Sequence, residues 1–161
     1  NSIHQDSMLD EVNEIIKIAK NNNVKVHIPV DVVCAKEFDN NSPAKVFDIM
    51  NIDKDYEGMD AGPKSLLKFK EVVLNSKTIL WNGPLGVFEF SNFSKGTKEL
   101  GKYISESTQN GAFSLVGGGD SVAAVKSFKM QKNMSYVSTG GGAMLESLEG
   151  KNLPGINALL K

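Results

Sequence analysis

SLVGGGDSVAAV, residues 114–125, contains the clearest fold signal in the chain. Residues 115–116 end a short apolar run that is typical of a buried strand, and residues 122–125 favour a helix. Three consecutive glycines, residues 117–119, separate the two segments. Because a strand, a tight turn and a helix in this order begin a βαβ unit, the stretch predicts an α/β fold.

The same order of elements recurs on both sides of this stretch. Short apolar runs at residues 78–81 and 136–138 are each followed by a glycine-containing turn, in WNGPLG and in TGGGA. Helical spacing of apolar residues is found in four segments, residues 63–75, 93–107, the stretch after Asp120, and the stretch from the last glycine turn to about Leu148. This alternation predicts a Rossmann-like three-layer sandwich with a mainly parallel sheet.

The amino-terminal third contains a helix pattern and β-prone runs. Apolar residues at helical spacing from Met8 to Ala19 predict a first helix that stops at residues 21–23. Alternation of apolar and polar residues predicts a strand over 24–30. The β-prone runs 31–37 and 45–49 flank a polar segment, which favours a hairpin.

Composition excludes several classes of partner and chemistry. The formal charge of −1 comes from 18 basic and 19 acidic residues, which argues against nucleic acid or an anionic membrane as a partner. All the basic residues are lysines, so a guanidinium group would have to come from another chain or from sequence outside this one. One cysteine, Cys34, no membrane-length apolar run and no signal-peptide pattern at the start lead us to expect a cytoplasmic protein.

The glycine-rich strand ends are open to two interpretations. In parallel sheets, ligands bind beyond the carboxyl ends of the strands, and glycines followed by a helix start can place backbone N–H groups against a phosphate. The same glycines can also serve only as tight turns. For Asp120 the alternatives are an N-cap and a ligand of Mg²⁺ on a polyphosphate. Neither a Walker A motif nor a GxGxxG fingerprint is present.

Five segments together resemble the carboxyl-terminal portion of phosphoglycerate kinase. They are HIPVDVV (27–33), GMDAGP (58–63), WNGPLGVFEF (81–90), LVGGGDS (115–121) and VSTGGGAMLESLEGKNLPG (137–155), in the family's order. The resemblance covers essentially all of residues 1–161, and it implies most of the nucleotide-binding domain of a two-domain kinase. It therefore also implies that the α/β fold is incomplete relative to the full family domain.

The resemblance implies the reversible transfer of a phosphoryl group between 1,3-bisphosphoglycerate and ADP, giving 3-phosphoglycerate and ATP, with Mg²⁺. It assigns the nucleotide site by motif position: Gly58, Met59, Pro84 and Val87 to the adenine pocket, Glu89 to the ribose, Asn82, Gly118, Gly119 and Ser121 to the phosphate side, and Asp120 to Mg²⁺ through the nucleotide. It assigns Gly140, Gly141 and Gly142 to the loop at the transferring phosphate, where Gly119 and Gly142 are the catalytic pair whose N–H groups meet the phosphoryl group.

Two parts of the family pattern lie outside this sequence. The amino-terminal domain with its catalytic arginine is absent, and so is the first part of the nucleotide domain with its phosphate-binding lysines. We therefore expect the chain alone to be inactive and to need the missing amino-terminal domain as its partner, in a full enzyme that is a monomer. A non-catalytic nucleotide- or phosphate-binding fragment and a purely structural fragment remain the alternatives.

Overall fold

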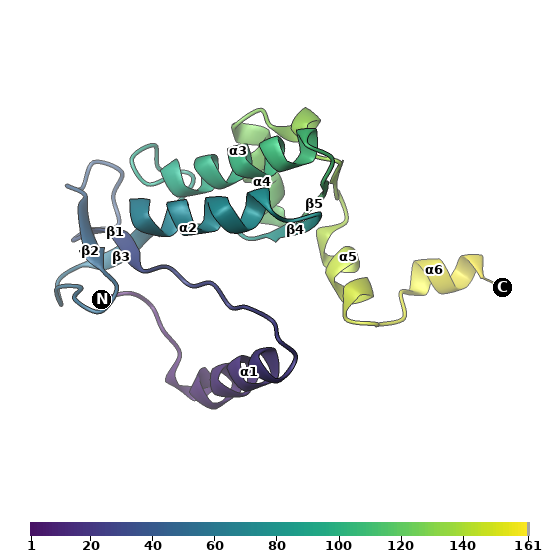
Figure 1. Ribbon diagram of the computed structural model, residues 1–161, viewed down its shortest axis with the longest axis horizontal. Helices are drawn as coiled ribbons and strands as arrows, with labels where there is room; N and C mark the ends of the chain where they lie inside the picture. Colours follow the sequence, from purple (N-terminus) through teal and green to yellow (C-terminus); the bar gives the residue numbers. More distant parts are fainter. Residues whose placement is uncertain (161) are drawn as a thin grey trace.

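Two three-stranded sheets, one antiparallel and one parallel, divide the strands of the chain (Figure 1). The structure is a computed structural model and describes residues 1–160. The helices are α1 (Leu9–Asn21), α2 (Pro63–Leu74), α3 (Lys95–Gln109), α4 (Gly119–Ser127), α5 (Gly141–Leu148) and α6 (Pro154–Leu159). The strands are β1 (Asp31–Ala35), β2 (Lys45–Asp48), β3 (Glu57–Ala61), β4 (Thr78–Asn82), β5 (Phe113–Gly117) and β6 (Tyr136–Val137).

The parallel sheet has the strand order β4-β5-β6 and confirms the α/β prediction for the second half of the chain. Asn82 pairs with Gly117, and Val116 pairs with Val137, so the three strands end at one edge. The predicted helices are also present, and Pro63 begins α2, where its missing N–H costs no helical hydrogen bond.

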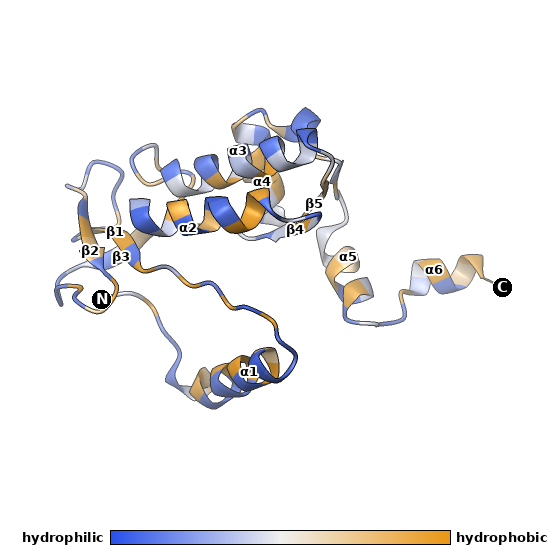
Figure 2. Cartoon of the chain, in the orientation of Figure 1, coloured by the Kyte–Doolittle hydropathy of each residue, from blue (hydrophilic) through white to orange (hydrophobic). Residues whose placement is uncertain are grey.

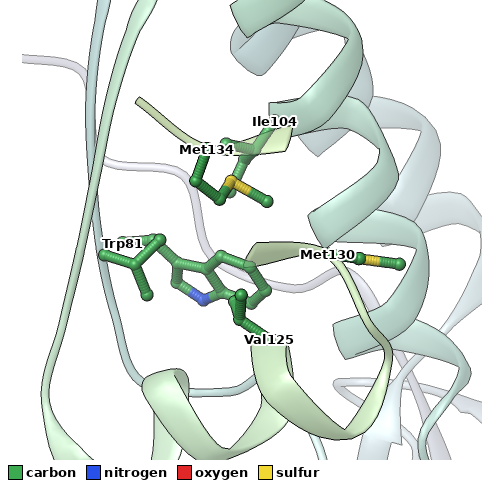
Figure 3. Close-up of a cluster of buried hydrophobic side chains, with 6 residues drawn as sticks. Trp81, Ile104, Val125, Met130 and Met134 are labelled. Carbon is green, nitrogen blue, oxygen red and sulfur yellow. The ribbon is translucent and has the colours of Figure 1, made fainter. Parts of the chain in front are cut away.

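One face of the parallel sheet packs against α3 and α4 (Figure 3). The buried cluster on this face consists of Trp81, Ile104, Val116, Val125, Met130 and Met134. Trp81 comes from β4, Ile104 from α3 and Val125 from α4. Burial of a large apolar side chain stabilises a fold by roughly 1.5–3 kcal/mol, so this cluster fixes the strands relative to the helices.

The first three strands form an antiparallel sheet with the order β2-β1-β3. The predicted hairpin is confirmed, because β1 and β2 pair from Asp31 with Asp48 to Cys34 with Lys45. The third strand of this sheet, β3, was not predicted from the sequence. Met59 of β3 is buried with Ala35 and Phe93 in a second apolar cluster, and this packing stabilises a strand of low β propensity.

The predicted strand over residues 24–30 does not form. Residues 24–29 are extended, but they pair with no strand among residues 1–160. Val24, Val26 and Ile28 alternate as predicted, yet they are 54–65% exposed. A strand needs a neighbour for its backbone N–H and C=O groups, and alternation alone does not supply one.

Helix α1 lies apart from the two sheets, joined to them by extended segments (Figure 1). The predicted helix is confirmed, and Figure 2 colours its apolar residues orange between hydrophilic residues in blue. Five of these side chains are between 47% and 59% exposed: Leu9, Val12, Ile15, Ile16 and Ile18. None of the helices in the described part of the chain is long and apolar enough to span a membrane.

Candidate functional site

The candidate site lies where β4, β5 and β6 end. The turn after β4 begins at Asn82, the turn after β5 comprises Gly117–Gly119, and the turn after β6 runs from Ser138 to Gly142. The Ser138 N–H donates to the Val116 carbonyl at 2.8 Å, which extends the β5-β6 pairing by one residue into the last turn. The register therefore brings together the three glycine-rich turns that the sequence predicted to share one edge.

Hydrogen bonds connect the turn after β4 to the start of α4. The Gly83 N–H donates to Ser121 Oγ at 2.5 Å, and the indole N–H of Trp81 donates to the Gly83 carbonyl at 2.8 Å. Ser121 is fully buried. Its hydroxyl thus holds two turns together, and its predicted contact with phosphates stays a prediction.

The turns after β5 and β6 approach each other at glycines. Gly118 has a φ of 85°, and a Cβ there would overlap Asn82 Oδ1. A Cβ at Gly141 would lie 2.6 Å from the backbone nitrogen of Gly118. Only glycine readily adopts the φ of Gly118, and only glycine at position 141 lets the two backbones approach this closely.

Three other glycines of the turns face open space. A Cβ at Gly119, Gly140 or Gly142 would have no heavy atom within 4 Å. Gly119 begins α4, and Gly142 is the second residue of α5. Because the first N–H groups of a helix lack partners within the helix, a ligand at this edge can reach two helix starts without meeting a side chain.

Asp120 is exposed and occupies the second position of α4. The N-cap of α4 is Gly118, and no side-chain hydrogen bond caps the helix, so the interpretation of Asp120 as an N-cap is wrong. Residues 1–160 contain no group of three or more His, Cys, Asp or Glu residues that could hold a metal ion. A magnesium ion at Asp120 would therefore take its other ligands from phosphates and water, which is the usual manner for Mg²⁺.

A pocket of about 310 Å³ lies between β3 and the turn after β4. It brings together the four residues predicted for adenine, Gly58, Met59, Pro84 and Val87. The Val87 N–H donates to the Met59 carbonyl at 2.9 Å and closes this pocket on one side. Glu89, predicted for the ribose, is exposed in the turn that follows Val87 and does not line the pocket. A larger pocket of about 490 Å³ involves His27 and α2, away from the strand ends.

Two buried aspartates that the sequence analysis did not single out connect the antiparallel sheet to helix starts. Asp31 of β1 accepts hydrogen bonds from the Lys64 and Ser65 N–H groups at the start of α2, at 3.0 and 2.8 Å. Although burial raises the pKa of Asp31, the hydrogen bonds from Ser65 and Lys64 outweigh it and leave this pKa below its usual range. A charged residue in an apolar strand run, as in PVDVV, is the signal that could have identified Asp31.

Asp60 of β3 is the second buried aspartate, 5% exposed, and it lines the 310 Å³ pocket. Its Oδ2 accepts from the Gly96 N–H at the start of α3 at 2.6 Å, and its Oδ1 accepts from the Ala61 N–H at 2.8 Å. Burial raises the pKa of Asp60 to about 6, against the lowering effect of these two N–H groups and of Lys95. Asp60 thus holds the start of α3 against the pocket wall.

Comparisons with known proteins show the family and the fold of the chain. The family model described as phosphoglycerate kinase matches residues 1–151. The chain belongs to the phosphoglycerate kinase family. The mixed α/β structure of this chain, with its parallel sheet of three strands, is similar to part of a solved phosphoglycerate kinase structure.

Relatives and structures of phosphoglycerate kinases match nearly the whole chain. The chain is 55% identical over 158 residues to the phosphoglycerate kinase of Porphyromonas gingivalis, covering 98% of this chain and 38% of the relative. The phosphoglycerate kinase of Borrelia turicatae is 47% identical over 160 residues, covering 99% of this chain and 40% of the relative. The phosphoglycerate kinase structure from Coxiella burnetii superposes with a TM-score of 0.91 at 40% identity, covering 98% of this chain and 40% of that one. The chain therefore spans about two fifths of the length of the phosphoglycerate kinases it matches.

Proposed function

We propose that this chain supplies the nucleotide half of a phosphoglycerate kinase. The reaction is the reversible transfer of a phosphoryl group between 1,3-bisphosphoglycerate and ADP, which gives 3-phosphoglycerate and ATP in glycolysis. The observation that supports this proposal is the meeting of three glycine-rich turns at one sheet edge, beside a pocket lined by Gly58, Met59, Pro84 and Val87.

In this proposal the base enters the pocket between β3 and the turn after β4. Met59 and Val87 give it an apolar wall, and the exposed Glu89 accepts hydrogen bonds from the ribose hydroxyls. Asn82 faces the phosphate side, because its side-chain oxygen lies beside Gly118. The nucleotide then extends from the pocket toward the starts of α4 and α5.

The transferring phosphoryl group lies between Gly119 and Gly142. Phosphoryl transfer requires positioning and stabilisation of charge on the equatorial oxygens, and N–H groups fixed at helix starts supply both without reorganisation. The open space at both glycines supports this placement. Magnesium, when bound, would neutralise the polyphosphate charge, and Asp120 is the residue of this chain that would hold it.

Turnover by this chain requires the part of the enzyme that lies outside it. The sequence contains no arginine, so a guanidinium group that stabilises the transferred phosphoryl must come from elsewhere. The test is a chimera in which this chain replaces the matched segment of the Porphyromonas gingivalis phosphoglycerate kinase. We expect 3-phosphoglycerate-dependent formation of ADP from the chimera and none from the 161-residue chain; a folded chimera without this activity would refute the proposed function.

Asp120→Ala tests the metal role within the chimera. We expect weaker binding of Mg-ADP, by about tenfold, and little change for ADP without magnesium. Asp10→Ala is a matched control, because Asp10 is also exposed and also occupies the second position of its helix, α1. An equal loss in both variants, or no loss at Asp120, would remove Asp120 from the metal site.

A second candidate function is nucleotide binding without catalysis. The lack of arginine and the span of two fifths of the relatives favour it for the chain by itself. Titration of the chain with Mg-ADP distinguishes the candidates. Binding without turnover in the chain, together with an inactive chimera, would support the non-catalytic function.

A further inference from the structure

The turn formed by residues 84–87 is one wall of the 310 Å³ pocket, and two elements hold it in place. From β3, the Met59 carbonyl accepts the Val87 N–H at 2.9 Å. From α3, Thr97 Oγ1 accepts the N–H groups of Leu85 and Gly86 at 3.1 and 3.3 Å. Thr97 is fully buried, so its hydroxyl has a fixed position only if the start of α3 does.

Asp60 fixes the start of α3 relative to β3. Asp60 follows Met59 in β3, and its carboxylate accepts the Gly96 N–H at 2.6 Å. Thr97 is the next residue of α3 after Gly96, so this hydrogen bond places Thr97 over the turn. A Cβ at Gly86 or at Gly96 would overlap the Asp60 carboxylate. The turn, the helix start and the strand therefore pack directly on one carboxylate.

We propose that Asp60 is a positioning residue of the nucleotide site, which holds the turn 84–87 against β3 and so sets the shape of the pocket that takes the base. This inference rests on the proposed function. Asp60 acts through Gly96 and Thr97, and it needs no contact with the nucleotide.

The chemistry of the carboxylate makes the role specific to aspartate. Both oxygens accept N–H donors, from Gly96 and from Ala61. An asparagine has one acceptor oxygen, and its NH₂ group would face one of these donors. A glutamate is longer by one methylene group, for which the contacts of Gly86 and Gly96 with the carboxylate leave no room.

The experiment compares Asp60→Asn with Asp31→Asn in the chimera defined above. Asp31 is the matched control, because it is buried in the same sheet, accepts N–H groups at the start of α2, and does not line the pocket. For Asp60→Asn we expect the KM for ATP to rise about tenfold, as loss of a hydrogen bond to a charged group predicts, while kcat changes less than about twofold. For Asp31→Asn we expect both constants to stay within about twofold.

Binding of inorganic tripolyphosphate separates positioning of the base from general damage. Tripolyphosphate has no base, so we expect its Kd to stay within about twofold in Asp60→Asn. Thr97→Val removes the acceptor for the Leu85 and Gly86 N–H groups and should reproduce the rise in KM. Thr97→Ser keeps the hydroxyl and should leave KM at the value of the original chimera. Equal effects on ATP and tripolyphosphate, or equal KM values for Asp60→Asn and Asp31→Asn, would overturn the inference.

Amide hydrogen exchange tests the inference without catalysis. In the 161-residue chain, the amides of Leu85, Gly86 and Val87 should exchange about tenfold faster in Asp60→Asn than in Asp31→Asn. Equal exchange would overturn the positioning role even if the chimera is an active kinase. An inactive chimera with the expected exchange difference would refute the proposed function and leave the structural role of Asp60 in place.

Discussion

The two buried aspartates should give the stability of the chain opposite responses to pH. The perturbations are Asp60→Asn and Asp31→Asn, each of which removes one titrating group and keeps the size of the side chain. Burial raises the pKa of Asp60 to about 6, whereas hydrogen bonds keep the pKa of Asp31 low in spite of its burial. The same type of residue in the same sheet therefore titrates in different pH ranges.

The sign follows from which state binds the proton more tightly. The folded chain binds a proton at Asp60 more tightly than the unfolded chain does, so the stabilisation from this group is present below the unfolded pKa and is lost as the pH rises through about 6. A pKa raised from 3.8 to about 6 corresponds to about 3 kcal/mol. Asp31 has the opposite sign: its stabilisation is present above the unfolded pKa and is lost as the pH falls through the lowered folded value.

Urea unfolding measures both effects. Trp81 is the single tryptophan and is 3% exposed, so its fluorescence reports on unfolding of the core. Between about pH 7.5 and about pH 4, the free energy of unfolding of the original chain should rise relative to Asp60→Asn by about 2.4 kcal/mol, which is most of the full effect. Relative to Asp31→Asn, the free energy of unfolding of the original chain should stay constant over most of this range. It should decrease once the pH is below about 4.

Parallel pH profiles for the original chain and Asp60→Asn would refute this reasoning. They would mean that solvent reaches the Asp60 carboxylate and that the start of α3 does not enclose it. A profile for Asp31→Asn that resembles the one expected for Asp60→Asn would refute the assignment of hydrogen bonding as the dominant effect at Asp31.

Four further substitutions test the core, the glycine turns and the separate position of α1. Ile104→Ala should lower the free energy of unfolding by about 3 kcal/mol, because Ile104 is 1% exposed in the main cluster; urea unfolding measures it. Gly118→Ala should destabilise the chain by at least about 1 kcal/mol because its φ is 85°. Gly119→Ala should change stability by less than about 0.5 kcal/mol and weaken Mg-ADP binding in the chimera about tenfold, as titration would show. Ile16→Lys on α1, at a side chain that is 51% exposed, should leave Trp81-detected unfolding within about 0.5 kcal/mol.

The elements that local sequence predicts well are those whose partners are close in sequence. The strand at 113–117, the glycine turn and α4 are consecutive, and hydrophobic periodicity plus the glycines define all three. The strand predicted at 24–30 shows the limit of prediction from local sequence. Its apolar and polar residues alternate as in a strand, but no strand among residues 1–160 pairs with it. The opposite case is β3, whose local sequence contains Glu57, Gly58 and Asp60 and does not predict a strand. This strand forms because tertiary packing stabilises it.

The residues of the candidate site also differ in how well local sequence predicts them. Glycines at strand ends and the pocket residues could be proposed from motifs, and four of the latter do share one pocket. The roles of Asp31 and Asp60 could not, because their partners are backbone N–H groups more than thirty residues away, at Ser65 and Gly96. No local pattern contains a contact of that range.

The close approach of Gly118 and Gly141 also constrains how this family can vary. A side chain in place of Gly141 would require space that the backbone of Gly118 already occupies, whereas Gly119, Gly140 and Gly142 face open space. A larger residue in place of Gly141 should therefore require a shift of the turn after β5. Libraries that randomise both turns should recover glycine at 118 and 141 among folded variants, and should accept other residues at 119, 140 and 142.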